Sequence, residues 1–178
     1  MKFQDIPQFT SAGNYQIDVP LGFIKKTLED YKNVYGLEMN PDFQRGNVWT
    51  ENQQTAFVEY FFKGGKSANV IYFNHPDFGR GSREDSDLPN MVLVDGLQRL
   101  TAITKFLDNE LPIFDGHYYK DFEDKPRDLK YMLKFNINDL QYRREVLKWY
   151  IDMNSGGTVH SEEEINRVQA LLDREPKG

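Results

Sequence analysis

The chain contains Met91-Val-Leu-Val-Asp-Gly-Leu-Gln-Arg-Leu-Thr-Ala-Ile-Thr-Lys-Phe-Leu107, which predicts an apolar strand that breaks at Asp95-Gly96 and continues as an amphipathic helix. Such a turn presents free backbone N–H groups and the positive end of the helix dipole. Gly96 allows a sharp turn without a side chain, and Arg99 is expected on the helix face of Asp95. The segment therefore predicts a site at which N–H groups and Arg99 bind phosphate and Asp95 binds Mg²⁺ or a water. The alternative is that Asp95 caps the helix and Arg99 is solvated.

A second segment precedes a predicted helix start. Thr50 and Gln53 form a capping box, so Gln44-Arg45 is expected in a loop or short strand just before a helix. The planar guanidinium of Arg45 suits phosphate oxygens, and the alternative, which we weight equally, is a pair with a surface carboxylate. Trp49 is expected to fill the core.

A third segment lies between two predicted helices. One helix is expected to end at about Met153, at a turn through Asn154-Ser-Gly-Gly157, and the next to begin at Ser161 with Glu164 as its capping partner. The two glycines allow a left-handed stretch whose N–H groups form an anion-binding concavity. The alternative is an ordinary turn between helices.

In this order, the three segments resemble the N-terminal domain of the GmrSD-type modification-dependent restriction proteins. The hallmarks of that family are a Gln-Arg…Val-Trp segment, a strand ending in Asp-Gly-Gln-Gln-Arg-Leu-Thr, and an Asn-x-Gly-Gly-Thr turn before a Ser-x-x-Glu helix. The likeness spans about Asn40 to Leu172. The matching residues are Gln44-Arg45, Val48-Trp49, Asp95-Gly96-Leu97-Gln98-Arg99-Leu100-Thr101, Asn154-Ser155-Gly156-Gly157-Thr158, Ser161 and Glu164.

The resemblance implies a ParB/sulfiredoxin-like α+β fold and a domain that binds a nucleoside triphosphate, ATP or GTP, with slow Mg²⁺-dependent hydrolysis. Asp95 would hold the metal, Arg99 and Arg45 would neutralise phosphate charge, and Gln98 would position a water or a phosphate oxygen. The catalytic residues are then Asp95, Gln98 and Arg99. The nucleotide-binding residues are Gln44, Arg45, Gly96, Thr101, Asn154, Gly156, Gly157 and Thr158.

Leu97 departs from the family pattern, because it replaces the first glutamine of the Gln-Gln pair. If that glutamine orients a water or contacts the nucleotide, hydrolysis is slowed or lost here while binding survives. If its side chain points into the core, leucine is a harmless apolar substitute. Helical spacing favours the second interpretation, because one stripe contains Leu97, Leu100, Ile103, Thr104 and Leu107.

A nuclease domain with a His-Asn-His-type metal site follows this domain in the restriction proteins, whereas this sequence ends at Gly178. Its histidines, His75, His117 and His160, lack metal-ligand spacing, so we do not expect a nuclease from this chain alone. A second hypothesis is therefore a non-catalytic interaction or inhibitory module, of the kind carried by bacteriophages, that binds a host protein.

Composition limits the other function classes. The 178 residues fit one domain, 1–178, with about 141–178 as a helical C-terminal extension. No cysteine is present, which excludes disulfides and thiolate sites, and neither a membrane span nor a signal peptide is predicted, so we expect a cytoplasmic protein. The net charge of −6 argues against nonspecific binding of nucleic acid, and a ParB-like fold alone does not indicate DNA binding.

The remaining pattern predicts an α+β domain with a small mixed sheet and packed helices. Residues 75–90 carry two glycines, four acids and almost nothing apolar, which predicts a flexible surface loop. We favour a plain hairpin insertion over a tip that folds over a ligand. Residues 115–119 indicate a turn before a strand. We expect strands at about 15–19, 69–73 and 131–137, and helices at about 21–35, 51–63, 141–153 and 161–174, the first of them ended by Gly36.

Overall fold

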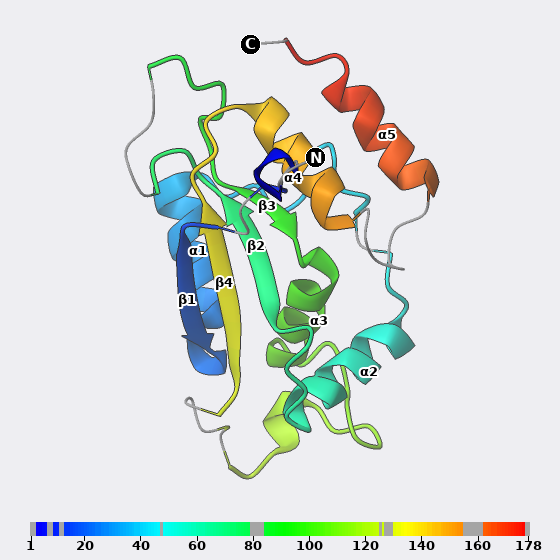
Figure 1. Ribbon diagram of the computed structural model, residues 1–178. Helices are drawn as coiled ribbons and strands as arrows, with labels where there is room; N and C mark the ends of the chain where they lie inside the picture. Colours follow the sequence, from blue (N-terminus) through cyan, green and yellow to red (C-terminus); the bar gives the residue numbers. More distant parts are fainter. Residues whose placement is uncertain are drawn as a thin grey trace.

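The computed structural model describes residues 3–6, 9–10, 13–46, 48–78, 84–124, 126, 130–154 and 162–176 (Figure 1). Over these residues the chain has five α-helices and one four-stranded sheet. The predicted α+β class is therefore confirmed.

The sheet is mixed, and its strand order differs from the order along the chain. The strands are β1 (Tyr15–Pro20), β2 (Val70–Asn74), β3 (Val92–Asp95) and β4 (Met132–Asn138), and they lie in the order β1-β4-β2-β3. The strand β4 pairs antiparallel with β1 and parallel with β2, and β2 pairs antiparallel with β3. The last strand in sequence therefore lies inside the sheet.

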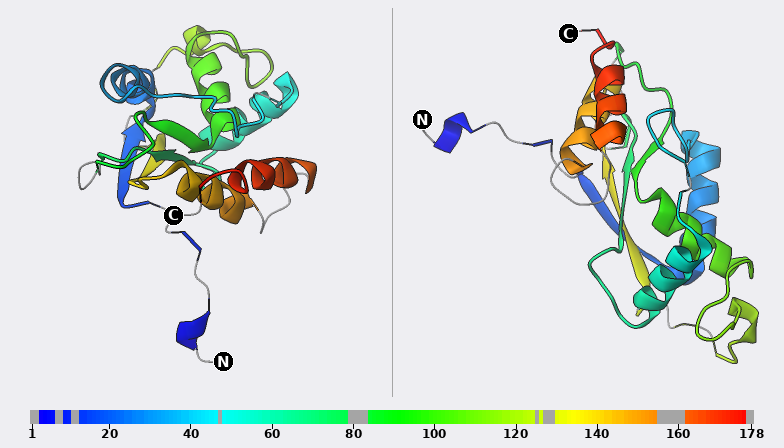
Figure 2. Two further views of the ribbon diagram at one scale, coloured as in Figure 1. Left: turned by 90° about the horizontal axis from the view of Figure 1, so that it is seen from above. Right: turned by 90° about the vertical axis from the view of Figure 1, so that its right-hand side faces the viewer.

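Helices cover both faces of the sheet. The helices are α1 (Ile24–Tyr35), α2 (Glu51–Phe62), α3 (Leu97–Leu107), α4 (Arg143–Asn154) and α5 (Glu162–Leu172). In Figure 2, α1, α2 and α3 lie on one side of the sheet and α4 and α5 on the other. Short 3₁₀ turns occupy Phe3–Asp5, Leu21–Phe23 and Tyr119–Asp121. None of the described helices is long and apolar enough to cross a lipid bilayer.

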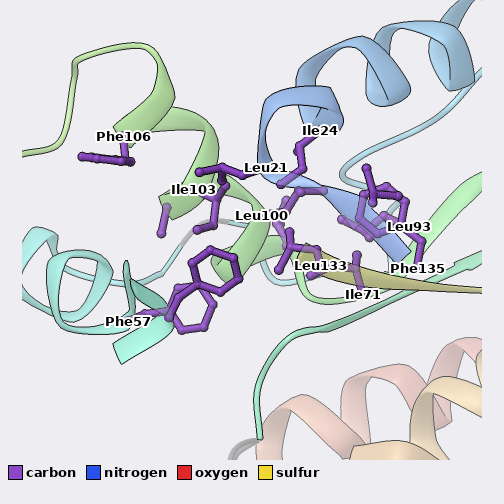
Figure 3. Close-up of a cluster of buried hydrophobic side chains, with 14 of the residues drawn as sticks. Leu21, Ile24, Phe57, Ile71, Leu93, Leu100, Ile103, Phe106, Leu133 and Phe135 are labelled. Carbon is purple, nitrogen blue, oxygen red and sulfur yellow. The ribbon is translucent and has the colours of Figure 1, made fainter. Parts of the chain in front are cut away.

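Each face of the sheet has its own buried cluster. The main core lies between the sheet and α1 to α3, and Figure 3 shows Ile71, Leu93, Leu133 and Phe135 of the strands meeting Leu100 of α3. The alternation along β4 explains this, because every second side chain of a strand points to the same face. A smaller cluster packs α4 and α5 on the other face, with Val94 and Trp149 among its members.

Local signals set several element ends as predicted. Thr50 caps α2, because its hydroxyl accepts the N–H of Gln53 and the Gln53 side chain accepts the N–H of Thr50. Gly36 follows α1 in a left-handed conformation with φ of 64°. The predicted helix at 21–35 begins with a 3₁₀ turn instead of an α-helical one. The strand predicted after residues 115–119 is wrong: Asp121 accepts the N–H of Tyr118, and a 3₁₀ turn forms there instead.

The segment between β2 and β3 connects two antiparallel strands, as a hairpin insertion does, and its residues 79–83 lie outside the described residues. It leaves β2 at Asn74 and enters β3 at Val92, which are paired residues, so its ends lie at the other end of β3 from Asp95. The interpretation in which this segment folds over a ligand at Asp95 has no support from this placement. The described part is also less polar than expected, because His75 and Leu88 are buried.

Candidate functional site

The turn from β3 into α3 has the backbone conformation that the sequence predicts. Gly96 is the N-cap of α3 with φ of 106°, and no side chain caps this helix end. A Cβ at Gly96 would lie 2.6 Å from Cδ1 and 3.3 Å from Cα of Ile71. Only glycine combines this left-handed backbone with so close an approach to β2. The alternative in which Asp95 caps α3 is therefore wrong.

Asp95 and Arg99 form the predicted pair across the first turn of α3. Nη2 of Arg99 donates to Oδ2 of Asp95, and Nη1 donates to the carbonyl of Ala68 at 3.4 Å. Both side chains are partly buried, with 17% of Arg99 and 29% of Asp95 exposed. A guanidinium has five N–H donors, so Arg99 keeps donors for a further acceptor.

Two glutamine side chains fix the loop from residue 44 to residue 49 over this turn. Nε2 of Gln44 donates to the carbonyls of Leu93 at 3.0 Å and Val94 at 2.8 Å. Gln98 accepts the N–H groups of Val48 and Trp49, both at 3.0 Å, and donates to the carbonyl of Gly46 at 2.6 Å. The loop that carries Arg45 is therefore bound to both β3 and α3.

Helix α5 holds the start of the same loop from the other side. Arg167 donates to the backbone carbonyls of Asp42 at 2.9 Å and Phe43 at 2.6 Å, and it also pairs with Glu164. Nη2 of Arg143, on α4, donates to both carboxylate oxygens of Asp42, at 2.9 Å each. The C-terminal helix pair thus contributes directly to the position of the predicted site.

A cavity of about 350 Å³ brings most of the predicted site residues together. This volume is within the range of small-molecule sites, roughly 300–1,000 Å³. Its lining residues are Gln44, Arg45, Trp49, Ser67, Ala68, Asp95, Gly96, Leu97, Gln98, Arg99, Met153 and Asn154. Two other cavities, of about 200 and 260 Å³, contain none of the predicted site residues.

Arg45 and Asn154 extend the polar lining of this cavity. Among the described residues, Arg45 has no hydrogen-bond or ion-pair partner, so its guanidinium is available to an anion there. Asn154, the last residue of α4, donates through Nδ2 to the carbonyl of Tyr150 at 2.7 Å. The expectation that Arg45 pairs with a surface carboxylate finds no such partner in the described part of the chain.

Two tyrosines, the buried Tyr150 and the half-buried Tyr72, belong to the electrostatic surroundings of Asp95. Burial raises the pKa of Tyr150 above its ordinary value of 10.0, and the charges of Glu164 and Asp95 raise this pKa further. Arg45 and Arg167 act on Tyr150 in the opposite direction. Burial and Asp95 likewise raise the pKa of Tyr72, which faces Asp95 across the β2–β3 pair. Both phenols therefore remain neutral donors at neutral pH.

Some predicted residues are not part of this lining. Thr101 lies one turn further along α3 and does not line the cavity. Gly156, Gly157, Thr158 and Ser161, which we expected to cap a helix, lie outside the described residues. Conversely, Ser67, Ala68 and Met153 line the cavity although no sequence motif marks them.

Leu97 takes the position that its spacing predicts. It is 9% exposed and belongs to the main core, and it also contributes to the cavity wall. The interpretation of Leu97 as an apolar core residue is therefore supported.

The oxygen donors at the cavity fit a Mg²⁺ ion that is held mainly by phosphates and water. The described residues contain no cluster of three or more His, Cys, Asp or Glu side chains placed to hold a metal. Asp95 supplies one carboxylate, of which Oδ2 accepts from Arg99. Mg²⁺ is commonly bound through one or two carboxylates plus substrate phosphates, so a single carboxylate suffices for a metal that enters with its ligand.

Neither described histidine lies at this cavity. His75 is buried and its Nδ1 accepts the N–H of Asp77 at 3.2 Å, while burial lowers its pKa below the ordinary 6.5. His117 is exposed and its Nδ1 contacts the carbonyl of Phe114. His160 lies outside the described residues.

One family matches this chain by sequence. The description "GmrSD restriction endonuclease, N-terminal domain" fits residues 24–131, which is more than half of the chain. This range holds the loop with Gln44-Arg45 and the whole of the β3–α3 turn, whereas β4, α4 and Asn154 follow it. Comparisons with curated proteins and with solved structures find no match.

Proposed function

The chain belongs to the family of GmrSD restriction endonuclease N-terminal domains, a module of restriction systems, and on that premise we propose that its cavity binds a nucleoside triphosphate with Mg²⁺ and hydrolyses it slowly. The observation that carries this proposal is the Asp95–Arg99 pair beside an uncapped helix N-terminus, in a cavity that also contains Arg45. The same membership supports a ParB/sulfiredoxin-like assignment of the fold.

Each group in the cavity suits one part of a triphosphate. Free N–H groups at the start of α3 and the positive end of its dipole attract phosphate oxygens. Arg45 supplies a guanidinium without a described protein partner, and Arg99 adds a second positive charge that Asp95 keeps in place. Phosphoryl transfer depends mainly on positioning and charge neutralisation, which this set provides.

Asp95 has two tasks in this proposal. One carboxylate oxygen orients Arg99, and the other is available to the Mg²⁺ or to one of its waters. When bound, Mg²⁺ would neutralise charge on the phosphate oxygens. Gln98, for which the motif suggests a water-positioning task, acts here by holding the backbone of the loop that carries Arg45.

A non-catalytic role, as an interaction or inhibitory module that acts on a host protein, is the second candidate. The observation that favours it is Leu97, because an apolar core residue replaces the first glutamine of the family motif. On this alternative the cavity binds nucleotide as a structural or regulatory ligand, without turnover.

The test is binding and phosphate release with ATP and GTP, with and without Mg²⁺, on wild type, Asp95→Ala and Arg99→Ala. Asp108→Ala is the matched control, because Asp108 ends the same helix and pairs with Lys25 instead of lining the cavity. We expect both site variants to lose turnover and the control to keep it. Turnover retained in both site variants would contradict an NTPase at this cavity, and binding without turnover would favour the second candidate.

A further inference from the structure

We infer that Trp49 is the surface on which the base of the nucleotide stacks, so that the cavity accepts adenine and guanine nucleotides with little discrimination. This inference rests on the proposed function and concerns the part of the ligand that the phosphate-binding groups do not contact. It arises from the cavity lining, in which Trp49 is the single aromatic side chain among the described residues.

Both the backbone and the ring of Trp49 are held in place. The backbone N–H of Trp49 donates to Gln98, and the backbone carbonyl of Trp49 accepts from Nε2 of Gln54 at 3.2 Å. Its ring contacts the buried ring of Phe57, with centroids 5.6 Å apart and planes inclined by 58°. The residue is nevertheless only half-buried and lines the cavity. A fixed aromatic surface loses little conformational entropy when a flat ligand packs on it.

The apolar side chains of the lining suit a flat ring better than another phosphate. Besides Trp49, the lining includes Ala68, Leu97 and Met153. Phosphate oxygens gain nothing from apolar side chains, whereas a purine loses unfavourable contact with water there. The cavity therefore has both a charged set of groups and an apolar set, as a nucleotide requires.

Three polar side chains of the lining, Gln44, Gln98 and Ser67, are engaged with the protein itself. Both N–H groups of the Gln44 amide are used by β3 carbonyls, and the Gln98 amide binds three backbone groups of the loop. The hydroxyl of Ser67 is bonded to that of Tyr60 at 2.6 Å. Selection between bases needs free hydrogen-bonding groups, whereas stacking is available to every base. The lining therefore favours a base held by stacking over a base that is read.

The experiment is isothermal titration with Mg²⁺ and three ligands: ATP, GTP and inorganic tripolyphosphate, which has no base. For wild type we expect ATP and GTP affinities within about threefold of each other, and tripolyphosphate about tenfold weaker, as one base–aromatic stack implies. Trp49→Leu should bring ATP to the level of tripolyphosphate and leave tripolyphosphate unchanged. Trp49→Phe should recover most of the ATP affinity.

Tryptophan fluorescence provides a second readout. The sequence has two tryptophans, and Trp149, a residue of α4, is buried with 1% exposure. ATP should therefore quench the emission of wild type, and Trp49→Phe, which keeps Trp149, should bind ATP without that quenching.

The outcomes separate this inference from the proposed function. If ATP binds no tighter than tripolyphosphate, or Trp49→Leu binds ATP like wild type, base stacking at Trp49 is overturned while the phosphate site stands. A preference of more than about tenfold between ATP and GTP would also overturn it, because stacking alone does not discriminate so strongly. If neither ATP nor tripolyphosphate binds wild type, the proposed function fails and this inference fails with it.

Discussion

Gln44 and Gln98 attach the loop of residues 44–49 to two different elements. Gln44, in the loop, bonds to carbonyls of β3, and Gln98, on α3, bonds to the backbone of the loop. The two residues of this pair are 54 positions apart, as their numbers give. This loop, residues 44–49, carries Arg45 and ends at Trp49. Arg45 and Trp49 both line the cavity. The geometry of the candidate site therefore depends on side chains that themselves need not touch a ligand.

Gln98→Ala removes three hydrogen bonds to the loop and leaves three backbone groups, two of them part-buried, without their partner. We expect a loss of about 2 kcal/mol in the free energy of unfolding, together with weakened nucleotide binding. Urea unfolding followed by circular dichroism measures the first effect and titration with ATP measures the second. Gln169→Ala, which removes one exposed bond to Asp173, is the matched control and should change stability by less than about 0.5 kcal/mol. Unchanged stability of Gln98→Ala would show that the loop does not depend on this amide.

Gly96→Ala combines a left-handed backbone with a clash, since the new Cβ would lie 2.6 Å from Cδ1 of Ile71. We expect a destabilisation of about 3 kcal/mol and loss of nucleotide binding, because the β3–α3 turn must shift. Gly64→Ala is the control, with φ of 90° and no atom within 4 Å of its Cβ. It should cost about 1 kcal/mol, from backbone strain alone. Equal losses in the two variants, measured by urea unfolding, would argue against the close approach at Gly96.

Leu97→Gln restores the residue that the family has at this position. Because Leu97 is 9% exposed and packs in the main core, we expect a loss of about 2 kcal/mol in stability. Leu97→Met keeps the apolar contact and should cost less than about 1.5 kcal/mol. Phosphate release measured on Leu97→Gln decides the second question: we expect no gain in turnover, and a clear gain would mean that this side chain reaches the nucleotide.

His75 should make stability depend on pH in the mildly acidic range. Burial lowers its folded-state pKa below the ordinary 6.5, so the unfolded chain binds a proton more readily than the folded protein does. The contribution of His75 to the free energy of unfolding is fully present above pH 6.5. This contribution decreases as the pH is lowered from 6.5 toward the folded-state pKa. Urea unfolding at a series of pH values should show a shallower slope below pH 6.5 in His75→Gln than in wild type. An identical slope in wild type and His75→Gln would contradict this role of His75.

Short-range features were predictable from sequence because their physical causes lie within a few residues. The capping box at Thr50, the left-handed Gly36 and the pair of Asp95 with Arg99 all join residues no more than four positions apart or depend on one backbone angle. The role of Trp49 was only half predicted, because it packs against the main core, on Phe57, and also lines the cavity.

Long-range features were not predictable, because they depend on which strands pair and in which register. Gln44 reaches Leu93 and Val94 only because its loop runs along the edge strand β3, where Glu38 also bridges to Val92. Tyr72 faces Asp95 through a β2–β3 register that no local pattern reveals. The identification of the site residues therefore came from the family motif, whereas their arrangement came from the sheet.

The position of β4 inside the sheet has a consequence for biosynthesis. β1, β2 and β3 leave the ribosome before β4, yet β1 and β2 are joined in the sheet only through β4. Met153 and Asn154, which line the cavity, emerge later still. A nascent chain that has just completed the Asp95–Arg99 motif thus carries the motif without the cavity. The complete lining of this cavity therefore forms only after residue 154 has emerged, and under the proposed function nucleotide binding is coupled to completion of the fold.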